Sequence, residues 1–251
     1  MKISATIITY NEERNVARAI ESLRCADEIL IVDSGSNDRT IEIAKQLGAT
    51  VLELSWLGYS AQKNAAAQKA SHDWILALDA DESLSESLEA EILELKKNGP
   101  KFDAYTMPRL AKYLGRWIRH SGWYPDRKVR LYHRAKAKWV GDFVHEAIKV
   151  EPGSTIGPLE GNLLHFTCDS LSEHLKTMDR YTTLAAEQLI DAKRQVSWGR
   201  LICEPPWTFF RTYVLKAGFL DGVEGLAIAN MAALYNFVKY AKVRFMGPGR
   251  P

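Results

Sequence analysis

Two aspartates stand one residue apart directly after an apolar run. Residues 74–78 (WILAL) are followed by Asp79, Ala80, Asp81 and Glu82. Aspartate is disfavoured inside strands, so we expect a buried strand here, with the acidic cluster in the loop at its carboxyl end. Carboxylates so close repel each other unless a cation lies between them, and oxygen ligands suit Mg²⁺ or Mn²⁺ bridged to phosphates. The alternative is that the aspartates cap a helix.

A repeated strand-then-helix pattern positions this cluster. Strands are predicted over residues 3–9, 28–33 and 48–54 as well as 74–78, with helical segments between them. Such units form a parallel sheet with right-handed connections and helices on both faces. The first two strands end in polar residues as well, so three polar clusters are expected at one edge of the sheet, where α/β folds bind ligands.

Four motifs in this order resemble the signatures of family 2 glycosyltransferases. They are residues 9–13 (TYNEE), 32–40 (VDSGSNDRT), 62–64 (QKN) and 78–82 (LDADE). The resemblance implies a GT-A fold, which is α/β with a Rossmann-like, mostly parallel sheet flanked by helices. It also implies a nucleotide-diphosphate sugar as donor and inversion of the anomeric centre. Ser34 stands where many members have a second aspartate.

Further motifs narrow the resemblance to the lipopolysaccharide core β-1,4-glucosyltransferases of that family. They lie at residues 122–132, 144–146, 164–166 and 213–222. The expected function is metal-dependent transfer of a hexose, glucose by this resemblance, from a UDP-sugar to a lipid-linked saccharide such as the lipopolysaccharide inner core. The alternatives are a family 2 transferase for capsule or exopolysaccharide assembly, and a non-catalytic nucleotide-sugar-binding membrane protein.

The resemblance places the donor at the predicted sheet edge. The residues expected to bind the nucleotide sugar are Thr9, Tyr10, Asn11, Glu12, Asp33, Ser34, Lys63, Asn64, Asp79, Ala80 and Asp81. Asp79 and Asp81 are expected to hold Mg²⁺ or Mn²⁺, which neutralises the leaving diphosphate. His145 is considered as a third metal ligand, as a substrate contact or as a partly buried polar residue. For His165, a structural role and a functional role are equally open.

An inverting transfer needs a general base that takes the proton of the acceptor hydroxyl. Glu146 is the first candidate because an acidic residue of the family stands at this position. Asp126 is the second candidate, although it also suits a turn after Pro125.

The segment 109–138 is strongly basic. It holds ten arginines and lysines against one acidic residue, interleaved with aromatic side chains. Guanidinium groups bind phosphate in a forked geometry, so we expect an anionic saccharide to bind here. The residues expected to bind the acceptor are Trp123, Tyr124, Arg127, Arg130 and His145. A solvated surface is the alternative, and no nucleic-acid-binding module is recognisable.

The C-terminal region differs in character. A long helix is predicted over residues 169–194, and Pro205-Pro206 is expected to break the chain before an aromatic cluster. From Arg200 onward the chain carries seven basic and three acidic residues, which favours an anionic lipid surface. The alternative is that these aromatics pack on the catalytic domain or on a second copy. The expected domains are therefore a catalytic domain, 1–166, with a nucleotide-sugar half (1–100) and an acceptor half (101–166), and a helical membrane-associating region, 167–251.

Composition fits a cytoplasmic enzyme, and the C-terminal region predicts a peripheral location on the inner face of the cytoplasmic membrane. The 251 residues can bury a sizeable core, the net charge is +2, and the three cysteines lack metal or redox spacing. The first residues lead into a strand and do not suggest a secretory signal. A nucleotidyltransferase would carry a Gly-rich basic loop after its first strand, and a polyprenyl-phosphate transferase would be expected to carry spanning helices. Neither feature is present.

Overall fold

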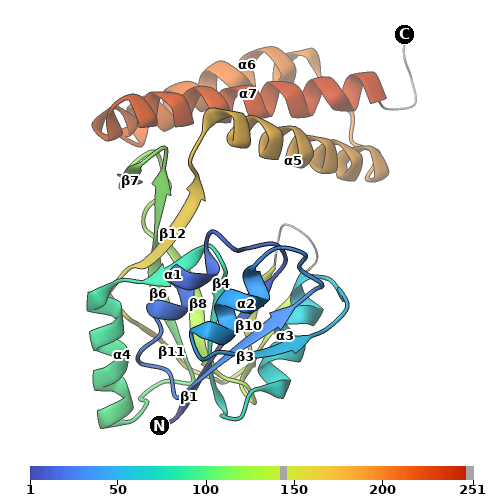
Figure 1. Ribbon diagram of the computed structural model, residues 1–251. Coiled ribbons are helices and arrows are strands. Elements are labelled where there is room, and N and C mark those ends of the chain that lie inside the picture. Colours follow the sequence, from blue (N-terminus) through green and yellow to red (C-terminus); the bar gives the residue numbers. More distant parts are fainter. Residues whose placement is uncertain (142–145, 247–251) are drawn as a thin grey trace. The chain divides into compact units, whose positions relative to one another are not determined.

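The computed structural model describes residues 1–141 and 146–246 (Figure 1). The chain divides into two compact units. The first consists of Met1–Arg109 and Asp126–His165, and the second of Leu110–Pro125 and Phe166–Pro251. The predicted boundary near residue 166 remains a prediction about domains. The compact units differ from it in one segment, because residues 110–125 group with the C-terminal helices.

The predicted parallel strands are confirmed. They are β1 (Ile3–Thr9), β2 (Glu28–Asp33), β3 (Thr50–Glu53) and β4 (Trp74–Asp79), which lie in the order β3-β2-β1-β4 and pair in parallel. Beyond β4 the sheet continues through antiparallel pairs with strands that sequence patterns did not single out. The order continues β8-β6-β12-β5, where β8 is Asp126–His133, β6 Ala104–Tyr113, β12 Leu163–Cys168 and β5 Glu82–Leu84.

Four short strands complete the sheets. Both β7 (Arg116–Ile118) and β11 (Ile156–Pro158) pair with β6. A separate antiparallel ribbon consists of β9 (Ala137–Val140) and β10 (Ala147–Val150). This ribbon matters for the site because Glu146 immediately precedes β10.

Four helices flank the parallel strands: α1 (Val16–Glu21), α2 (Thr40–Gln46), α3 (Tyr59–Lys69) and α4 (Glu86–Asn98). Helix α4 follows the acidic loop, and its N-cap is Ser85, whose side chain accepts a hydrogen bond from Leu88 N. Glutamates in its first turn and lysines in its last turn suit the helix dipole. Since Ser85 caps this helix, the capping explanation for Asp79 and Asp81 is excluded.

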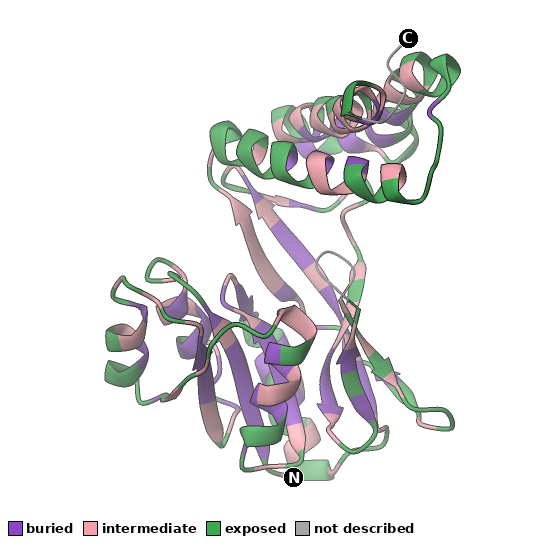
Figure 2. Ribbon diagram, turned by 90° about the vertical axis from the view of Figure 1, so that its right-hand side faces the viewer, coloured by how far each residue is buried: buried purple, intermediate pink, exposed green. Residues whose placement is uncertain are grey.

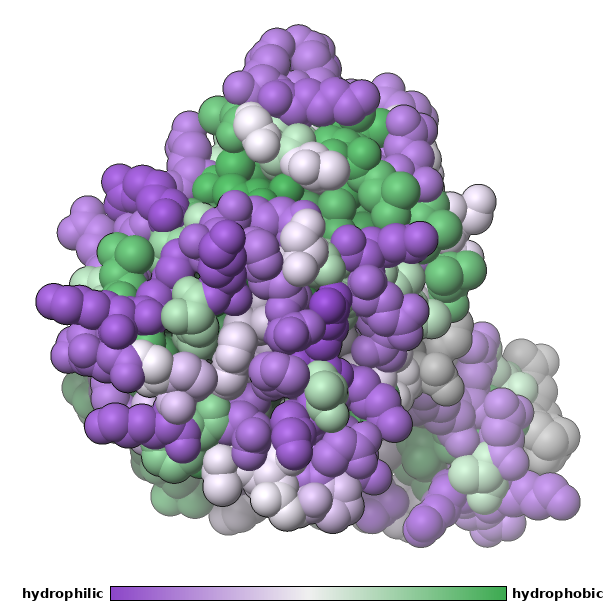
Figure 3. Space-filling view, turned by 90° about the horizontal axis from the view of Figure 1, so that it is seen from below, coloured by the Kyte–Doolittle hydropathy of each residue, from purple (hydrophilic) through white to green (hydrophobic). Residues whose placement is uncertain are grey.

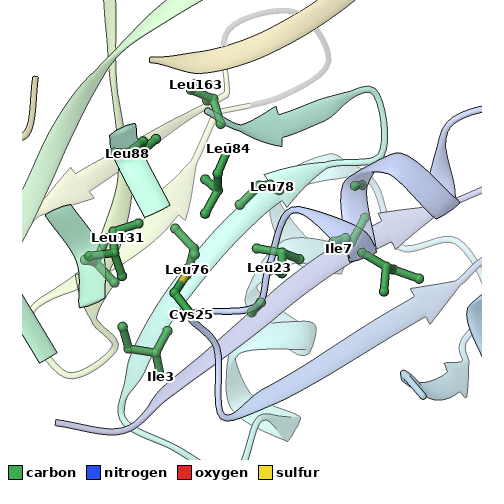
Figure 4. Close-up of a cluster of buried hydrophobic side chains, with 14 of the residues drawn as sticks. Ile3, Ile7, Leu23, Cys25, Leu76, Leu78, Leu84, Leu88, Leu131 and Leu163 are labelled. Carbon is green, nitrogen blue, oxygen red and sulfur yellow. The ribbon is translucent and has the colours of Figure 1, made fainter. Parts of the chain in front are cut away.

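Side chains of the central strands alternate between two apolar cores. Leu76 and Leu78 of β4 pack with Ile3 and Ile7 of β1 on one face (Figure 4), whereas Ile75 of β4 packs on the other. This two-residue period is that of a strand covered on both sides. Burying one such side chain contributes about 1.5–3 kcal/mol, so the sheet is a stable platform for loops at its edge. Most residues of β1, β2 and β4 are buried (Figure 2). The face of the molecule drawn in Figure 3 carries mostly hydrophilic side chains.

The second unit is mainly helical. It contains α5 (Leu171–Asp191), α6 (Trp198–Phe210), the π-helical turn η1 (Arg211–Leu215), the 3-10 turn η2 (Gly218–Asp221) and α7 (Gly222–Met246). The predicted long helix is confirmed as α5. Among the described residues no single helix is long and apolar enough to cross a bilayer. One pair, Trp198–Leu215 with Gly218–Met246, bent by 72°, meets both conditions together.

The expectation that Pro205-Pro206 would break the regular structure of the chain is wrong, because both prolines lie inside helix α6. Interior proline costs about 3 kcal/mol through a lost hydrogen bond and a steric clash. Helix α6 lies along α7 (Figure 1), where Asn236 donates to Thr208 Oγ1 at 2.8 Å and Thr208 is buried. The packing of α6 against α7 outweighs the unfavourable effect of the two prolines, and the sequence alone does not show this packing.

Candidate active site

Polar side chains from β1 and β2 meet at the carboxyl edge of the sheet. Asp33 is fully buried and accepts four hydrogen bonds there. The donors are Thr9 Oγ1 (2.7 Å), Ser36 Oγ (2.6 Å), Ser36 N (2.7 Å) and Gly35 N (2.9 Å). The predicted nucleoside contact of Asp33 remains a prediction. In the structure this carboxylate ties the loop after β2 to the end of β1.

The loop after β1 is held against the loop after β2. Asn11 has a left-handed backbone (φ 56°), its N–H donates to Ser36 Oγ, and its side chain accepts from Asn37 N. Tyr10 beside it is 59% exposed, so its ring is available to a ligand. Burial raises the pKa of Glu12. A hydrogen bond from Asn15 offsets part of this, and the negative charges of neighbours including Asp81 raise it further.

Asp79, the last residue of β4, lies between two buried cations. Lys63 Nζ is 2.6 Å from Asp79 Oδ1, and the Arg130 guanidinium donates to Asp79 Oδ2 at 2.7 Å. Burial opposes ionisation of Asp79, but the charges of Arg130 and Lys63 outweigh it and hold the pKa of this carboxyl far below its ordinary value. Arg130 also binds Glu82, which is fully buried, through Nε (3.1 Å) and a terminal nitrogen (2.8 Å).

Glu146 joins the same network. Its Oε1 accepts from Lys63 Nζ at 2.9 Å, so one ammonium bridges Asp79 and Glu146. Its Oε2 is buried and has no hydrogen-bond partner within the part of the chain that the structure describes. A buried carboxylate oxygen without a donor is unfavourable unless a ligand supplies one.

Asp126, the other candidate base, differs from Glu146 in the partners of its carboxylate oxygens. Its Oδ2 accepts from Arg109 at 2.7 Å, and Lys128 Nζ is 3.0 Å from Oδ1. Burial opposes ionisation of Asp126, but Lys128 and Arg109 lower its pKa. Both oxygens are therefore engaged by cations. Arg109 also approaches Glu82 at 3.7 Å, so Asp126 and Glu146 are the two ends of one chain of alternating charges.

Asp81 lies close to His165, whose role the sequence analysis left open. Its Oδ2 is 3.3 Å from His165 Nε2 in β12. His145, the histidine predicted as a metal ligand, lies outside the described residues, as do Asp142 to Val144. No group of three or more metal-ligating side chains is found among residues 1–141 and 146–246. Among the described residues, the groups that could bind a cation beside Asp81 are therefore its own carboxylate and the His165 imidazole.

Helix α3 supplies three polar residues that are held by the protein itself. Gln62 is fully buried and donates to Ser34 Oγ and Leu54 O. Asn64 makes a pair of hydrogen bonds, both 2.9 Å, with the backbone of Trp139 in β9. The predicted roles of Lys63, Asn64 and Ser34 toward the nucleotide remain predictions, and the structure shows each engaged within the protein.

The predicted acceptor residues fall in both units. Arg127 forms an exposed pair with Glu160, and Arg130 is buried against Asp79 and Glu82, and the predicted acceptor contacts of both arginines remain predictions. Trp123 and Tyr124 belong to the second unit, where Trp123 packs edge-on against Tyr113. Their role in acceptor binding remains a prediction.

The second unit has a polar centre of its own, which the sequence analysis did not single out. Asp221 is buried and accepts from Arg119 N (3.1 Å), His120 N (3.0 Å) and Ser121 Oγ (3.3 Å), and it lies 3.0 Å from His120 Nδ1. This carboxylate fixes the loop that precedes Trp123. Its place in the motif at residues 213–222 was a signal, but its partners lie 100 or more residues earlier in the chain.

A parallel sheet with acidic residues at its carboxyl edge, continued by antiparallel strands, is the GT-A fold of nucleotide-sugar glycosyltransferases. The structure of mannosyltransferase PcManGT from Pyrobaculum calidifontis, in complex with GDP-Man and Mn²⁺, shares this fold. It aligns with a TM-score of 0.54 at 13% identity over 96% of this chain and 86% of that chain.

Sequence comparison defines the family. The model of glycosyl transferase family 2 matches residues 4–149. An uncharacterized glycosyltransferase of Rickettsia typhi is 32% identical over 97% of this chain and 87% of its own length. The lipopolysaccharide core biosynthesis glycosyltransferase LpsC of Rhizobium meliloti is 30% identical over 97% of this chain and 92% of its own. The chain therefore belongs to glycosyltransferase family 2, and the predictions of fold, family and enzyme class are confirmed.

Proposed function

We propose that this glycosyltransferase moves a hexose from a UDP-sugar to a lipid-linked saccharide such as the lipopolysaccharide inner core, with inversion of the anomeric centre. Glucose is the hexose that we propose. The similarity to LpsC supports the acceptor class. The observation that carries the chemistry is the Lys63 bridge. It holds Asp79 of the aspartate pair and the candidate base Glu146 on one ammonium, at the edge where the fold binds nucleotide sugars.

Glu146 is the better candidate for the general base. A base needs an oxygen with a free lone pair within reach of the acceptor hydroxyl. Glu146 Oε2 is buried and unpartnered in the described part of the chain, whereas both oxygens of Asp126 are bound by cations. The proposed step is proton transfer from the acceptor hydroxyl to Glu146 Oε2 as that hydroxyl attacks the anomeric carbon. The diphosphate leaves from the opposite face.

Asp81 and His165 fit a divalent cation. Carboxylate oxygen suits Mg²⁺ and Mn²⁺, and an imidazole 3.3 Å from that oxygen favours Mn²⁺ over Mg²⁺. Asp79 is committed to Lys63 and Arg130, so Asp81 is the main carboxylate ligand. When bound, the cation would neutralise charge on the diphosphate. Mn²⁺ titration followed by electron paramagnetic resonance tests this site, because Asp81→Asn and His165→Gln should each weaken binding.

The second unit is proposed to lie on the inner face of the cytoplasmic membrane, where a lipid-linked acceptor is found. Exposed apolar residues recur every four positions along α6 and η1, which places Trp198, Ile202, Pro206, Phe210 and Val214 on one stripe. Aromatic and apolar side chains on such a stripe, with basic residues nearby, suit the headgroup layer. The double variant Ile202→Ser, Phe210→Ser should no longer float with anionic vesicles, and undiminished flotation would contradict this placement.

The reaction itself is tested by a donor screen. UDP-, GDP- and dTDP-hexoses are incubated with the protein and Mn²⁺, and nucleotide release is measured with and without rough lipopolysaccharide. The proposal expects UDP release that rises when the acceptor is added. Release that favours GDP- or dTDP-sugars would exclude a UDP-sugar donor. An unchanged rate with the acceptor present would contradict the lipopolysaccharide assignment.

A further inference from the structure

Lys63 has an environment that is unusual for a lysine. Its side chain is 4% exposed, and its ammonium lies 2.6 Å from Asp79 Oδ1 and 2.9 Å from Glu146 Oε1. The same ammonium lies over the Trp139 ring, with Lys63 Nζ 4.2 Å from the ring centroid. Lysine is almost never fully buried unless it is paired, because its charge must be compensated. Two carboxylates and a π-face supply that compensation here.

We propose that Lys63 is a positioning residue for the general base. By holding Glu146 Oε1, the ammonium fixes the carboxylate so that Oε2 faces the acceptor hydroxyl. By holding Asp79 at the same time, it sets the distance between the base and the donor edge. This inference rests on the proposed function, in which Glu146 takes the proton.

The surroundings of Lys63 are built to keep it in place. Asn64, the next residue of α3, is bonded to the Trp139 backbone through both atoms of its amide, which fixes α3 against β9. Arg130 lies over the same Trp139 ring at 5.2 Å and holds the other oxygen of Asp79. The ammonium therefore has little freedom to move away from the two carboxylates.

Two other roles for Lys63 make different predictions. If its ammonium bound the donor diphosphate, it would have to leave one of the carboxylates, and its loss would weaken nucleotide affinity. If it served only to neutralise buried charge, its loss would reduce stability, and its effect on turnover would be independent of Glu146. A positioning role predicts an effect on turnover that exists only while Glu146 is present.

The experiment is a double-mutant cycle with UDP-glucose as donor and rough lipopolysaccharide as acceptor. Lys63→Met should lower kcat by about 10–10²-fold, part of the 10²–10⁴ that a general base contributes. The Kd of UDP, measured by calorimetry, should stay within about threefold. Residues that act as a unit are non-additive, so Lys63→Met in a Glu146→Gln background should lower kcat no further. Lys63→Arg should restore part of the rate, since a guanidinium also bridges two carboxylates.

Lys96→Met is the matched control. Lys96 pairs with Asp27 at 2.8 Å and donates to Cys25 O, so it reports the general cost of losing a partly buried lysine pair. Its kcat should equal that of the wild type. If Lys63→Met does not fold, Lys63→Gln serves in its place with the same expectations.

The possible failures can be told apart. A tenfold or larger rise in the Kd of UDP would overturn the inference in favour of diphosphate binding. Full additivity of Lys63→Met and Glu146→Gln would overturn it in favour of charge neutralisation. If Glu146→Gln alone kept wild-type turnover, the proposed base itself would be wrong.

Discussion

Within the basic segment 109–138, the two units differ in how their cations are paired. In this segment, six of the seven cations in the first unit pair with carboxylates, and Lys136 is the exception. The three in the second unit, Lys112, Arg116 and Arg119, have no carboxylate partner among the described residues. Lys112 and Arg119 lie against aromatic rings, and Arg116 donates to Leu220 O. In this segment the first unit therefore commits nearly all of its cations to carboxylates, two of them at the site, whereas the described cations of the second unit keep no carboxylate partner.

The hydrophobic residues follow the same division. The first unit buries its apolar side chains in two cores on either side of the sheet. The second unit exposes large apolar residues along α6, η1 and η2. Exposed apolar surface with unpaired cations marks an interaction surface, and buried charge with full pairing marks a preorganised site. The contrast predicts that substitutions in the first unit change chemistry or stability, and that substitutions in the second unit change binding.

The largest effect is expected at the proposed base. Glu146→Gln should lower kcat by about 10²–10⁴ while UDP binding persists, because the amide cannot take the proton. Asp126→Asn should have a smaller effect, since both Asp126 oxygens already bind cations. Steady-state UDP release measures both variants. The reverse result would exchange the roles of the two carboxylates.

Arg130→Met should destabilise the first unit by about 3–5 kcal/mol, because the fully buried Glu82 loses the cation that binds it at hydrogen-bond distance and Asp79 keeps only Lys63. Urea unfolding measures the loss. Arg39→Met is the control, since Arg39 and Glu42 form an exposed pair within one helical turn. Its unfolding midpoint should not change. Equal effects of the two substitutions would remove the distinction between site-building and surface pairs.

Asp79 should make stability depend on pH in the acid range. Its pKa is lower in the folded protein than in the unfolded chain, so the unfolded chain binds the proton more readily. The stabilisation is fully present above the unfolded pKa of about 3.9 and is lost as pH falls below it. The difference in the free energy of unfolding between the wild type and Asp79→Asn should therefore become smaller below about pH 4. A difference that stayed constant from pH 7 to pH 3 would contradict this reasoning.

The smallest effects are expected in the second unit. Arg119→Glu and Lys112→Glu should each weaken binding to anionic vesicles by about 1 kcal/mol, with more loss at low salt. Unfolding midpoints should not change. Arg127→Glu in the first unit is the matched charge reversal and should leave vesicle binding as it is. Equal loss from all three would indicate a general charge effect in place of a surface formed by the second unit.

Sequence patterns were sufficient for the parallel half of the sheet. The β-branched run at 3–9 and the apolar runs at 28–33 and 74–78 gave strands with the predicted ends, because burial on both faces demands continuous apolar residues. The polar residues after those strands could be placed at one edge since parallel strands share a direction. The antiparallel strands and the prolines inside α6 were not predictable in the same way, because pairing and packing with distant segments decide them.

By itself the sequence determined which residues could do chemistry, and it grouped Asp79, Asp81 and Glu146 through motifs and strand ends. Only the tertiary structure decided their partners. Lys63 is separated from Glu146 by 83 positions and Asp79 from Arg130 by 51. The physical reason is that the energy of a charge depends on the groups around it in space. In the sequence, Arg130 is one of ten basic residues expected to face a phosphate, whereas in the folded chain it joins Lys63 in keeping the half-buried Asp79 ionised.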